Sequence, residues 1–80
     1  MIVDDTDIMR DSLKETLIRA GYDVDAFSNA KEALYSFKTN LYSLVITDLK
    51  MPQMDGIEFM TELQKISSDT PILIITAYGT

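Results

Sequence analysis

The sequence predicts an α/β fold built on a doubly wound parallel sheet, and three observations support this. Segments with helical spacing of apolar residues alternate with strand-like stretches, which predicts the element order βαβαβαβ. Two continuous apolar runs, Leu44–Thr47 and Ile72–Ile75, are typical of parallel strands that are covered on both faces. The 80 residues contain no internal repeat or linker, so they form one domain at most, spanning residues 1–80. Such an alternation predicts right-handed crossovers between the strands.

The first strand and the first helix come directly after one another. Met1–Val3 is a short strand that ends in the pair Asp4-Asp5. A helix follows from about Asp7 to Ala20, and Gly21 is a suitable residue to end it. Its apolar positions fall at i, i+4, i+8 and i+11, namely Met9, Leu13, Leu17 and Ala20. The pattern predicts an amphipathic helix.

The second strand and the second helix are predicted by alternation and by capping residues. Tyr22–Phe27 alternates strictly between apolar and polar residues, which indicates a strand with one polar face. Ser28 or Asn29 can cap the next helix, and Glu32, three residues after Asn29, gives a capping box. The apolar face of this helix consists of Ala30, Ala33, Leu34 and Phe37.

The third helix follows a stretch rich in turn residues, "MPQMDG". Pro52 fixes one backbone torsion, and Asp55 can cap the helix. Gly56 allows either a close backbone approach or an unusual torsion. The predicted stripe of the helix consists of Ile57, Met60, Leu63 and Ile66.

Strand order brings three carboxylates together. The strongly apolar strands belong inside the sheet and the alternating strand at an edge, which favours the order 2-1-3-4 with the winding reversed after the first strand. In open sheets of this kind, ligands bind beyond the carboxyl ends of the strands at that reversal. Asp4, Asp5 and Asp48 all stand there, and adjacent strands are about 4.8 Å apart. We therefore expect the three side chains to converge.

Three neighbouring acids repel one another, which predicts either raised pKa values or a bound cation. Mg²⁺ prefers oxygen ligands, is usually held by one or two carboxylates and keeps several waters. The hydroxyl of Thr76, at the end of the fourth strand, can donate a hydrogen bond toward the same cleft. The sequence therefore predicts a magnesium site at this edge of the sheet.

Composition excludes several classes of protein. The net charge of −6, with seven scattered basic residues, argues against binding to nucleic acid. The longest apolar runs are far too short to cross a bilayer. The absence of cysteine gives no disulfide framework. We expect a soluble, cytoplasmic protein that binds neither nucleic acid nor membrane.

Three motifs carry a resemblance to a known family: the Asp-Asp pair after the first strand, "DLKMPQMDG" after the third, and "ITA" after the fourth. With these motifs the chain resembles, over its whole length, a response-regulator receiver domain of two-component signalling. The resemblance implies a flavodoxin-like fold that takes a phosphoryl group from a sensor histidine kinase. "DLKMPQMDGIEFM" and "TAYGT" are similar to receivers of enhancer-binding transcriptional activators, which implies transcription as the output.

The resemblance also implies a role for each matching residue. Asp48 matches the phosphoacceptor, Asp5 the direct Mg²⁺ ligand, and Asp4 the acid that acts mainly through metal-bound water. Lys50 matches the position whose backbone carbonyl completes the metal site. The fourth strand supplies the remaining matches, the switch hydroxyl and the small residue beside it: Thr76 and Ala77.

The match has a gap at its carboxyl end. A complete receiver resembles a sheet of five strands with five helices, whose fifth strand ends in a lysine that pairs with the phosphoryl group. This chain ends at Thr80, so we expect a C-terminally incomplete receiver that lacks the fifth strand and the last two helices and accepts phosphate poorly. We also expect self-association through the Ile72–Ile75 edge, where Leu73 and Ile75, or Ile72 and Ile74, would be exposed.

Other interpretations stay open. Asp48 alone could be a loop or capping acid. The presence of Asp4, Asp5 and Thr76 at the other strand ends favours a functional site instead. The chain could be a non-signalling interaction module or half-domain fragment that retains receiver motifs. It could also be an aspartyl-nucleophile phosphohydrolase, but "DLK" offers no second acid two residues after Asp48. We therefore expect that the chain is not an enzyme.

Overall fold

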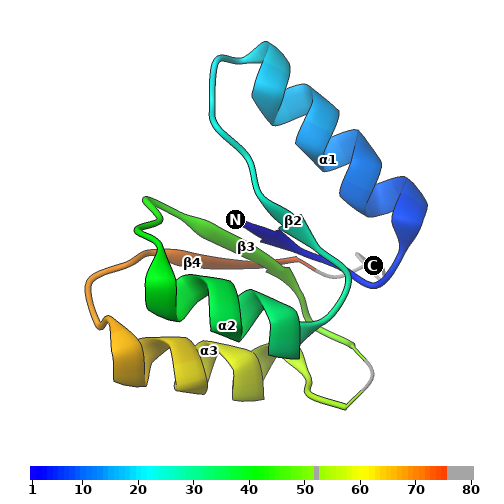
Figure 1. Ribbon diagram of the computed structural model, residues 1–80. Helices are drawn as coiled ribbons and strands as arrows, with labels where there is room; N and C mark the ends of the chain where they lie inside the picture. Colours follow the sequence, from blue (N-terminus) through cyan, green and yellow to red (C-terminus); the bar gives the residue numbers. More distant parts are fainter. Residues whose placement is uncertain (52, 76–80) are drawn as a thin grey trace.

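The structure of the chain, a computed structural model, describes residues 1–51 and 53–75 (Figure 1). The elements follow one another as β1 (Ile2–Val3), α1 (Asp7–Arg19), β2 (Ala26–Phe27), α2 (Ala30–Thr39), β3 (Val45–Asp48), α3 (Gly56–Ile66) and β4 (Ile72–Ile75). All strand pairs are parallel, and the order in the sheet is β2-β1-β3-β4. The predicted element order and the predicted strand order 2-1-3-4 are both confirmed.

The sheet has helices on both faces: α2 and α3 lie side by side on one face, and α1 lies on the other (Figure 1). Ile2, Ile46 and Leu73 stand opposite one another in the strand register, so they share a face, which is that of α1. The main core fills the space between the sheet and the α2–α3 layer. Its buried residues are Met1, Val3, Ala30, Ala33, Phe37, Val45, Met51, Phe59 and Leu63.

Helix α1 packs more loosely than the other two helices and buries none of its residues. On the sheet face that it covers, Ile2 and Ile46 are 1% and 7% exposed, whereas Leu73 on β4 is 52% exposed. One helix is too narrow to cover four strands, so this face stays open over β4. Of the two predicted exposed rows, the structure supports the one with Leu73, because Ile72 packs against the core. Self-association through β4 stays a prediction.

Strand β2 is shorter than the alternating pattern predicts. Only Ala26 and Phe27 are in the strand, and Tyr22, at the predicted start, is exposed. The neighbouring β1 has only two residues, so it can pair with only a short stretch. Asp25 extends the pairing slightly, since its carbonyl accepts from the Ile2 N–H at 2.9 Å. The prediction of a strand over Tyr22–Phe27 is therefore confirmed for its last two residues and wrong for the four before them, because alternation alone cannot supply backbone partners.

Helix α3 presents a different face to the core from the predicted stripe. Phe59 and Leu63 are fully buried, whereas Ile57 and Ile66 are 50% and 42% exposed. The buried residues Gly56, Phe59 and Leu63 lie at i, i+3 and i+7. The predicted stripe is therefore confirmed at Leu63 and wrong at Ile57 and Ile66, because the close contact at Gly56 constrains the rotation of the helix about its axis.

Gly56 lies against the backbone of the loop that leaves β3. Its N–H donates to the Leu49 carbonyl at 2.7 Å. A Cβ at this position would stand 2.5 Å from the Asp48 carbonyl oxygen and 2.9 Å from the Leu49 Cα. Among the described glycines only Gly21 has a positive φ, of 96°. Of the two reasons considered for Gly56, the close backbone approach is therefore the correct one.

The capping predictions are confirmed at three positions. The Asn29 side chain accepts from the Glu32 N–H at 2.9 Å and caps α2. The Asp55 side chain accepts from the Glu58 N–H at 2.8 Å and caps α3. Gly21 follows the end of α1 in the left-handed conformation that favours glycine. No helix in residues 1–51 and 53–75 has the length and apolar character needed to span a bilayer.

Candidate functional site

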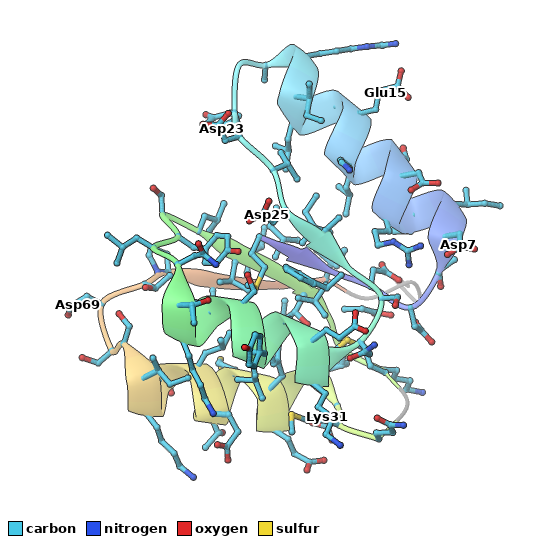
Figure 2. The ribbon with its side chains drawn as sticks, viewed as in Figure 1. Asp7, Glu15, Asp23, Asp25, Lys31 and Asp69 are labelled. Carbon is cyan, nitrogen blue, oxygen red and sulfur yellow. The ribbon has the colours of Figure 1, made fainter. Side chains whose placement is uncertain are left out.

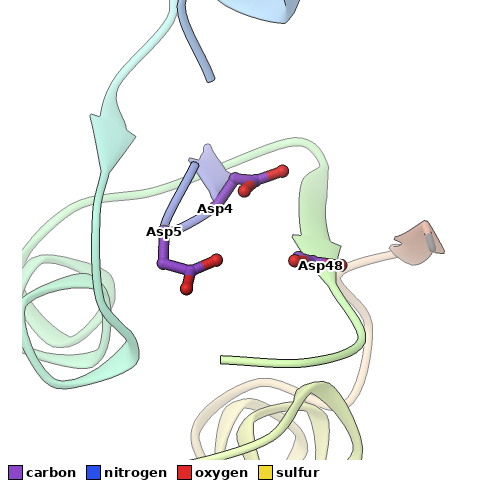
Figure 3. Close-up of side chains that lie close together, drawn as sticks. All are labelled: Asp4, Asp5 and Asp48. Carbon is purple, nitrogen blue, oxygen red and sulfur yellow. The ribbon is translucent and has the colours of Figure 1, made fainter. Parts of the chain in front are cut away.

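Three carboxylates meet where β1 and β3 end. Asp4 and Asp5 directly follow β1, and Asp48 is the last residue of β3. Because Ile2 stands opposite Ile46 in the register, Asp4 comes opposite Asp48 on the same face. Figure 3 shows the three side chains around one space between the strand ends. The convergence predicted from the sequence is confirmed.

The cluster has a size and chemistry that suit a small cation. Asp4, Asp5 and Asp48 can each offer one carboxylate oxygen, and these oxygens all lie within 4.8 Å of one another. In an octahedral Mg²⁺ site with ligands at about 2.0–2.1 Å, opposite ligand atoms are about 4.2 Å apart. The three carboxylate oxygens therefore lie close enough together for one such ion to be shared among them. The donor atoms are all carboxylate oxygens, which are the hard ligands that Mg²⁺ prefers, so the three residues suit a Mg²⁺ ion.

The three acids differ in their surroundings. Asp4 is buried, at 2% exposure, whereas Asp5 is exposed and Asp48 is half-buried. The Asp4 Oδ1 accepts a hydrogen bond from the Thr6 N–H at 2.8 Å. Burial raises the pKa of the Asp4 carboxyl above its ordinary value; the Thr6 hydrogen bond opposes this, and the charges of Asp48 and Asp5 add to it. The folded chain therefore binds a proton at Asp4 more tightly than the unfolded chain does.

This pKa shift predicts a pH dependence of stability in the absence of metal. Since the pKa of Asp4 is raised on folding, its contribution is fully present below the ordinary value of 3.8 and is lost as the pH rises through the folded-state value. The variant Asp4→Asn still offers an acceptor to the Thr6 N–H but carries no charge. In urea denaturation without metal, we expect the stability of Asp4→Asn to rise relative to the unmodified chain across that pH window.

The matched control for this test is Asp23→Asn, which removes one exposed carboxylate outside the cluster. Its stability relative to the unmodified chain should show no comparable rise in the same window. A constant difference between Asp4→Asn and the unmodified chain across the window would contradict the effect assigned to Asp4.

The backbone around Asp48 is held on several sides. The buried Thr47 hydroxyl donates to the Asp48 carbonyl at 3.1 Å. The Leu49 N–H donates to the Ile75 carbonyl at 2.9 Å, and the Leu49 carbonyl accepts from Gly56. The loop is thereby tied to β4 and to the start of α3, which holds the backbone that carries the Asp48 carboxylate.

The structure gives less information about the other predicted site residues. Lys50 is exposed in the loop two residues after Asp48. The role of its backbone carbonyl stays a prediction. Thr76 and Ala77 lie outside the described residues, as does Pro52. Their predicted roles are therefore neither confirmed nor contradicted.

One residue beside the cluster was missed in the sequence analysis. The Arg10 Nη1 donates to the Asp4 carbonyl oxygen at 2.9 Å, and its Nη2 forms an ion pair with the Asp7 carboxylate. An arginine three residues after an aspartate on a helix is a recognisable pair. The spacing could have indicated the ion pair, but not the contact with Asp4, which depends on how the chain turns between β1 and α1.

Comparison with known proteins identifies the family. Residues 1–80 match the family described as "Response regulator receiver domain". Among curated relatives, the C4-dicarboxylate transport transcriptional regulatory protein DctD of Rhizobium meliloti is 32% identical over 98% of this chain and 17% of its own length. The probable transcriptional regulator ycf27 of Porphyra purpurea is 42% identical over 99% of this chain and 32% of its own length. The chain thus spans about a third or less of these relatives.

Solved structures agree with this assignment. TrrA of Thermotoga maritima, in complex with Mg²⁺-BeF, is 41% identical with a TM-score of 0.91, covering 98% of this chain and 68% of that one. In its complex with the histidine kinase ThkA, TrrA is 40% identical with a TM-score of 0.90, covering 99% of this chain and 68% of that one. The fold is therefore the flavodoxin-like α/β sheet that the resemblance implied. The chain belongs to the response regulator receiver domain family.

Proposed function

We propose that this chain is the phosphoacceptor receiver of a two-component system, accepting a phosphoryl group on Asp48 from a sensor histidine kinase. The observation that carries the proposal is the convergence of Asp4, Asp5 and Asp48 within 4.8 Å at the end of β1 and β3. It occurs in a chain of the receiver family. The relative TrrA, solved in complex with a histidine kinase, supports the class of partner.

The transfer exchanges one phosphorus bond for another. An oxygen of the Asp48 carboxylate attacks the phosphorus of a phosphohistidine, the P–N bond breaks, and the imidazole keeps the electron pair. The product is an acyl phosphate on Asp48. We assign the acceptor role to Asp48 rather than Asp4, because Asp4 is buried and already holds the Thr6 N–H. We propose that the chain is the acceptor in this transfer, without catalytic turnover of its own, rather than an enzyme.

The acids would also hold a divalent cation. Asp5 and Asp48 would bind Mg²⁺ directly, Asp4 through water, and the Lys50 backbone carbonyl would complete the set. The relative TrrA is solved with Mg²⁺-BeF, which supports the choice of metal. When bound, the cation supplies positive charge that neutralises the phosphoryl oxygens. The role of this chain's own residues is to bind the cation and to orient the Asp48 carboxylate.

The phosphoryl group then acts as a switch. It adds a charge of roughly −1.5 to −2 and three acceptor oxygens beside the end of β3. We propose that the Thr76 hydroxyl donates to one of these oxygens, with the small Ala77 beside it. Because the relatives DctD and ycf27 are named as transcriptional regulators, we propose transcription as the output and the cytoplasm as the location. These names do not single out enhancer-binding activators, so that assignment stays a prediction.

A Mg²⁺ titration tests the site. A ligand that binds only the folded chain stabilises it by RT ln(1 + [L]/Kd), or about 2.7 kcal/mol at a concentration of 100 times Kd. We expect saturable stabilisation of the unmodified chain in thermal unfolding. Asp5→Ala should abolish this gain and, because it removes repulsion, raise the stability without metal.

The matched control is Asp69→Ala, which removes one exposed carboxylate on the α3–β4 connection (Figure 2). It should keep the full response to Mg²⁺. An unmodified, folded chain whose melting midpoint does not move at millimolar Mg²⁺ would point instead to a non-signalling module that retains receiver motifs.

A further inference from the structure

We propose that Arg10 is a positioning residue of the acidic site. Its guanidinium holds the turn between β1 and α1 in the conformation that directs Asp4 and Asp5 toward Asp48. The proposal rests on the proposed function, because it assigns Arg10 a role in the cation site of the receiver.

Arg10 differs from an ordinary surface arginine. Its side chain is only 17% exposed, whereas that of its ion-pair partner Asp7 is 81% exposed. On the same helix, Arg19 pairs with Glu15, and both of those side chains are largely exposed. Exposed pairs of that kind contribute little to stability. Arg10 is thus the more enclosed of the two paired arginines on this helix, and its Nη1 and Nη2 have partners at the acidic turn and in the first turn of the helix.

The contact that matters is with the Asp4 carbonyl, which accepts from the Arg10 Nη1 at 2.9 Å. A peptide bond is planar, so the Asp4 carbonyl and the Asp5 nitrogen lie in one rigid unit. Holding the carbonyl oxygen fixes the tilt of this unit and hence the direction in which Asp5 leaves it. Arg10 thereby orients a carboxylate that it does not touch.

The remaining contacts of Asp4 complete the arrangement. Its N–H donates to the Phe27 carbonyl at 3.1 Å, and its Oδ1 accepts from the Thr6 N–H. With Arg10 on its carbonyl, Asp4 is held through three separate groups. Asp4 is thus fixed to β2, to the turn and to α1. The direction of Asp5 is then set by the peptide unit that it shares with Asp4.

Helix α1 has few other anchors at this end. Thr6 stands at its N-cap position, but its side chain makes no capping hydrogen bond. The helix also buries none of its residues. The Arg10 contact therefore adds a bond from an α1 side chain to the Asp4 backbone, beside the bond between the Thr6 N–H and the Asp4 carboxylate, and the two together couple the start of α1 to the acidic turn.

The test compares Arg10→Met, which keeps an apolar stem but removes every donor, with Arg10→Lys, which keeps a charged donor. Arg19→Met is the matched control, since it removes an arginine with its ion pair from the exposed part of the same helix. Two quantities are measured on folded protein: the Kd for Mg²⁺, and the hydrogen-exchange rate of the Thr6 amide, which bonds the Asp4 carboxylate.

We expect Arg10→Met to raise the Kd for Mg²⁺ by about tenfold, the lower end of what residues that orient metal ligands contribute. The Thr6 amide should exchange several times faster. In Arg10→Lys, the Kd and the exchange rate should each lie between those of Arg10→Met and the unmodified chain. In Arg19→Met, both should equal those of the unmodified chain. A purely structural role would lower the stability while leaving the Kd of the folded protein unchanged, and that result would overturn the proposal.

The two measurements also separate this proposal from the proposed function. If the unmodified chain shows no saturable Mg²⁺ binding, the proposed function fails. The exchange rate of the Thr6 amide then tests by itself whether Arg10 positions the acidic turn. Equal rates in the unmodified chain and in Arg10→Met would overturn the positioning role as well.

Discussion

Replacement of Asp48 by Asn is expected to abolish phosphorylation of the chain by a small phosphodonor such as acetyl phosphate in the presence of Mg²⁺. The amide lacks the negative oxygen that attacks phosphorus, and it is a poorer cation ligand, while its size is almost unchanged. The backbone contacts of this position, from Thr47 and through Leu49 to β4, do not depend on the side chain. The variant should therefore fold normally and lose only the ability to accept the phosphoryl group.

The measurement is intact-mass and peptide mass spectrometry after a short reaction with the donor. One added phosphoryl group should be found at low occupancy in the unmodified chain, on Asp48, and none in Asp48→Asn. Asp69→Asn, which alters an exposed acid on the α3–β4 connection, should retain the label. Modification mainly of Asp23, Asp25 or Asp55 would show that the acceptor has been assigned to the wrong carboxylate.

Replacement of Gly56 by Ala is expected to have the largest effect on folding. The added methyl group would stand 2.5 Å from the Asp48 carbonyl oxygen and 2.9 Å from the Leu49 Cα. Both are backbone atoms at the end of β3, so they cannot rotate away as a flexible side chain could. Overpacking of this kind costs about 1–3 kcal/mol and occasionally more, and the rigid neighbours favour the upper end of that range.

Gly21→Ala provides the comparison for Gly56→Ala in urea denaturation. Gly21 has a φ of 96°, and apart from its chain neighbours no residue comes within 4 Å of an added Cβ. That substitution should therefore introduce only backbone strain, at about 1–2 kcal/mol. If Gly56→Ala were the milder of the two, the close approach of α3 to β3 would not be the constraint described above.

The features that could be predicted from the sequence are those with a local cause. The apolar run that becomes β4 is bounded as expected, and the cap residues Asn29 and Asp55 act within one helical turn. The meeting of Asp4 with Asp48 was also predictable, because parallel strands in this order bring their carboxyl ends to one edge. In each case, neighbouring residues or a general rule of topology decides the outcome.

The features that escaped prediction depend on contacts between distant segments. The inward face of α3 is set where Gly56 meets the backbone after β3, so Phe59 rather than Ile57 is buried. The length of β2 depends on how much of β1 is available to pair with it. The contact of Arg10 with Asp4 depends on the turn between them. Periodicity reports which residues are apolar, but it does not fix the rotation of a helix or the length of a partner strand.

The position of β1 in the sheet has a consequence for the order in which the chain can fold. This short first strand lies between β2 and β3, and its partner on one side, Ile46, comes more than half the chain later. The unit β3–α3–β4 joins strands that are close in sequence, so closing it costs less chain entropy than bringing β1 to β3. Non-local pairing of this kind slows folding. We therefore expect β1 to complete its pairing late, although it comes before the other strands in the sheet's chain order, and the acidic turn that follows it to take shape only when both halves of the sheet have joined.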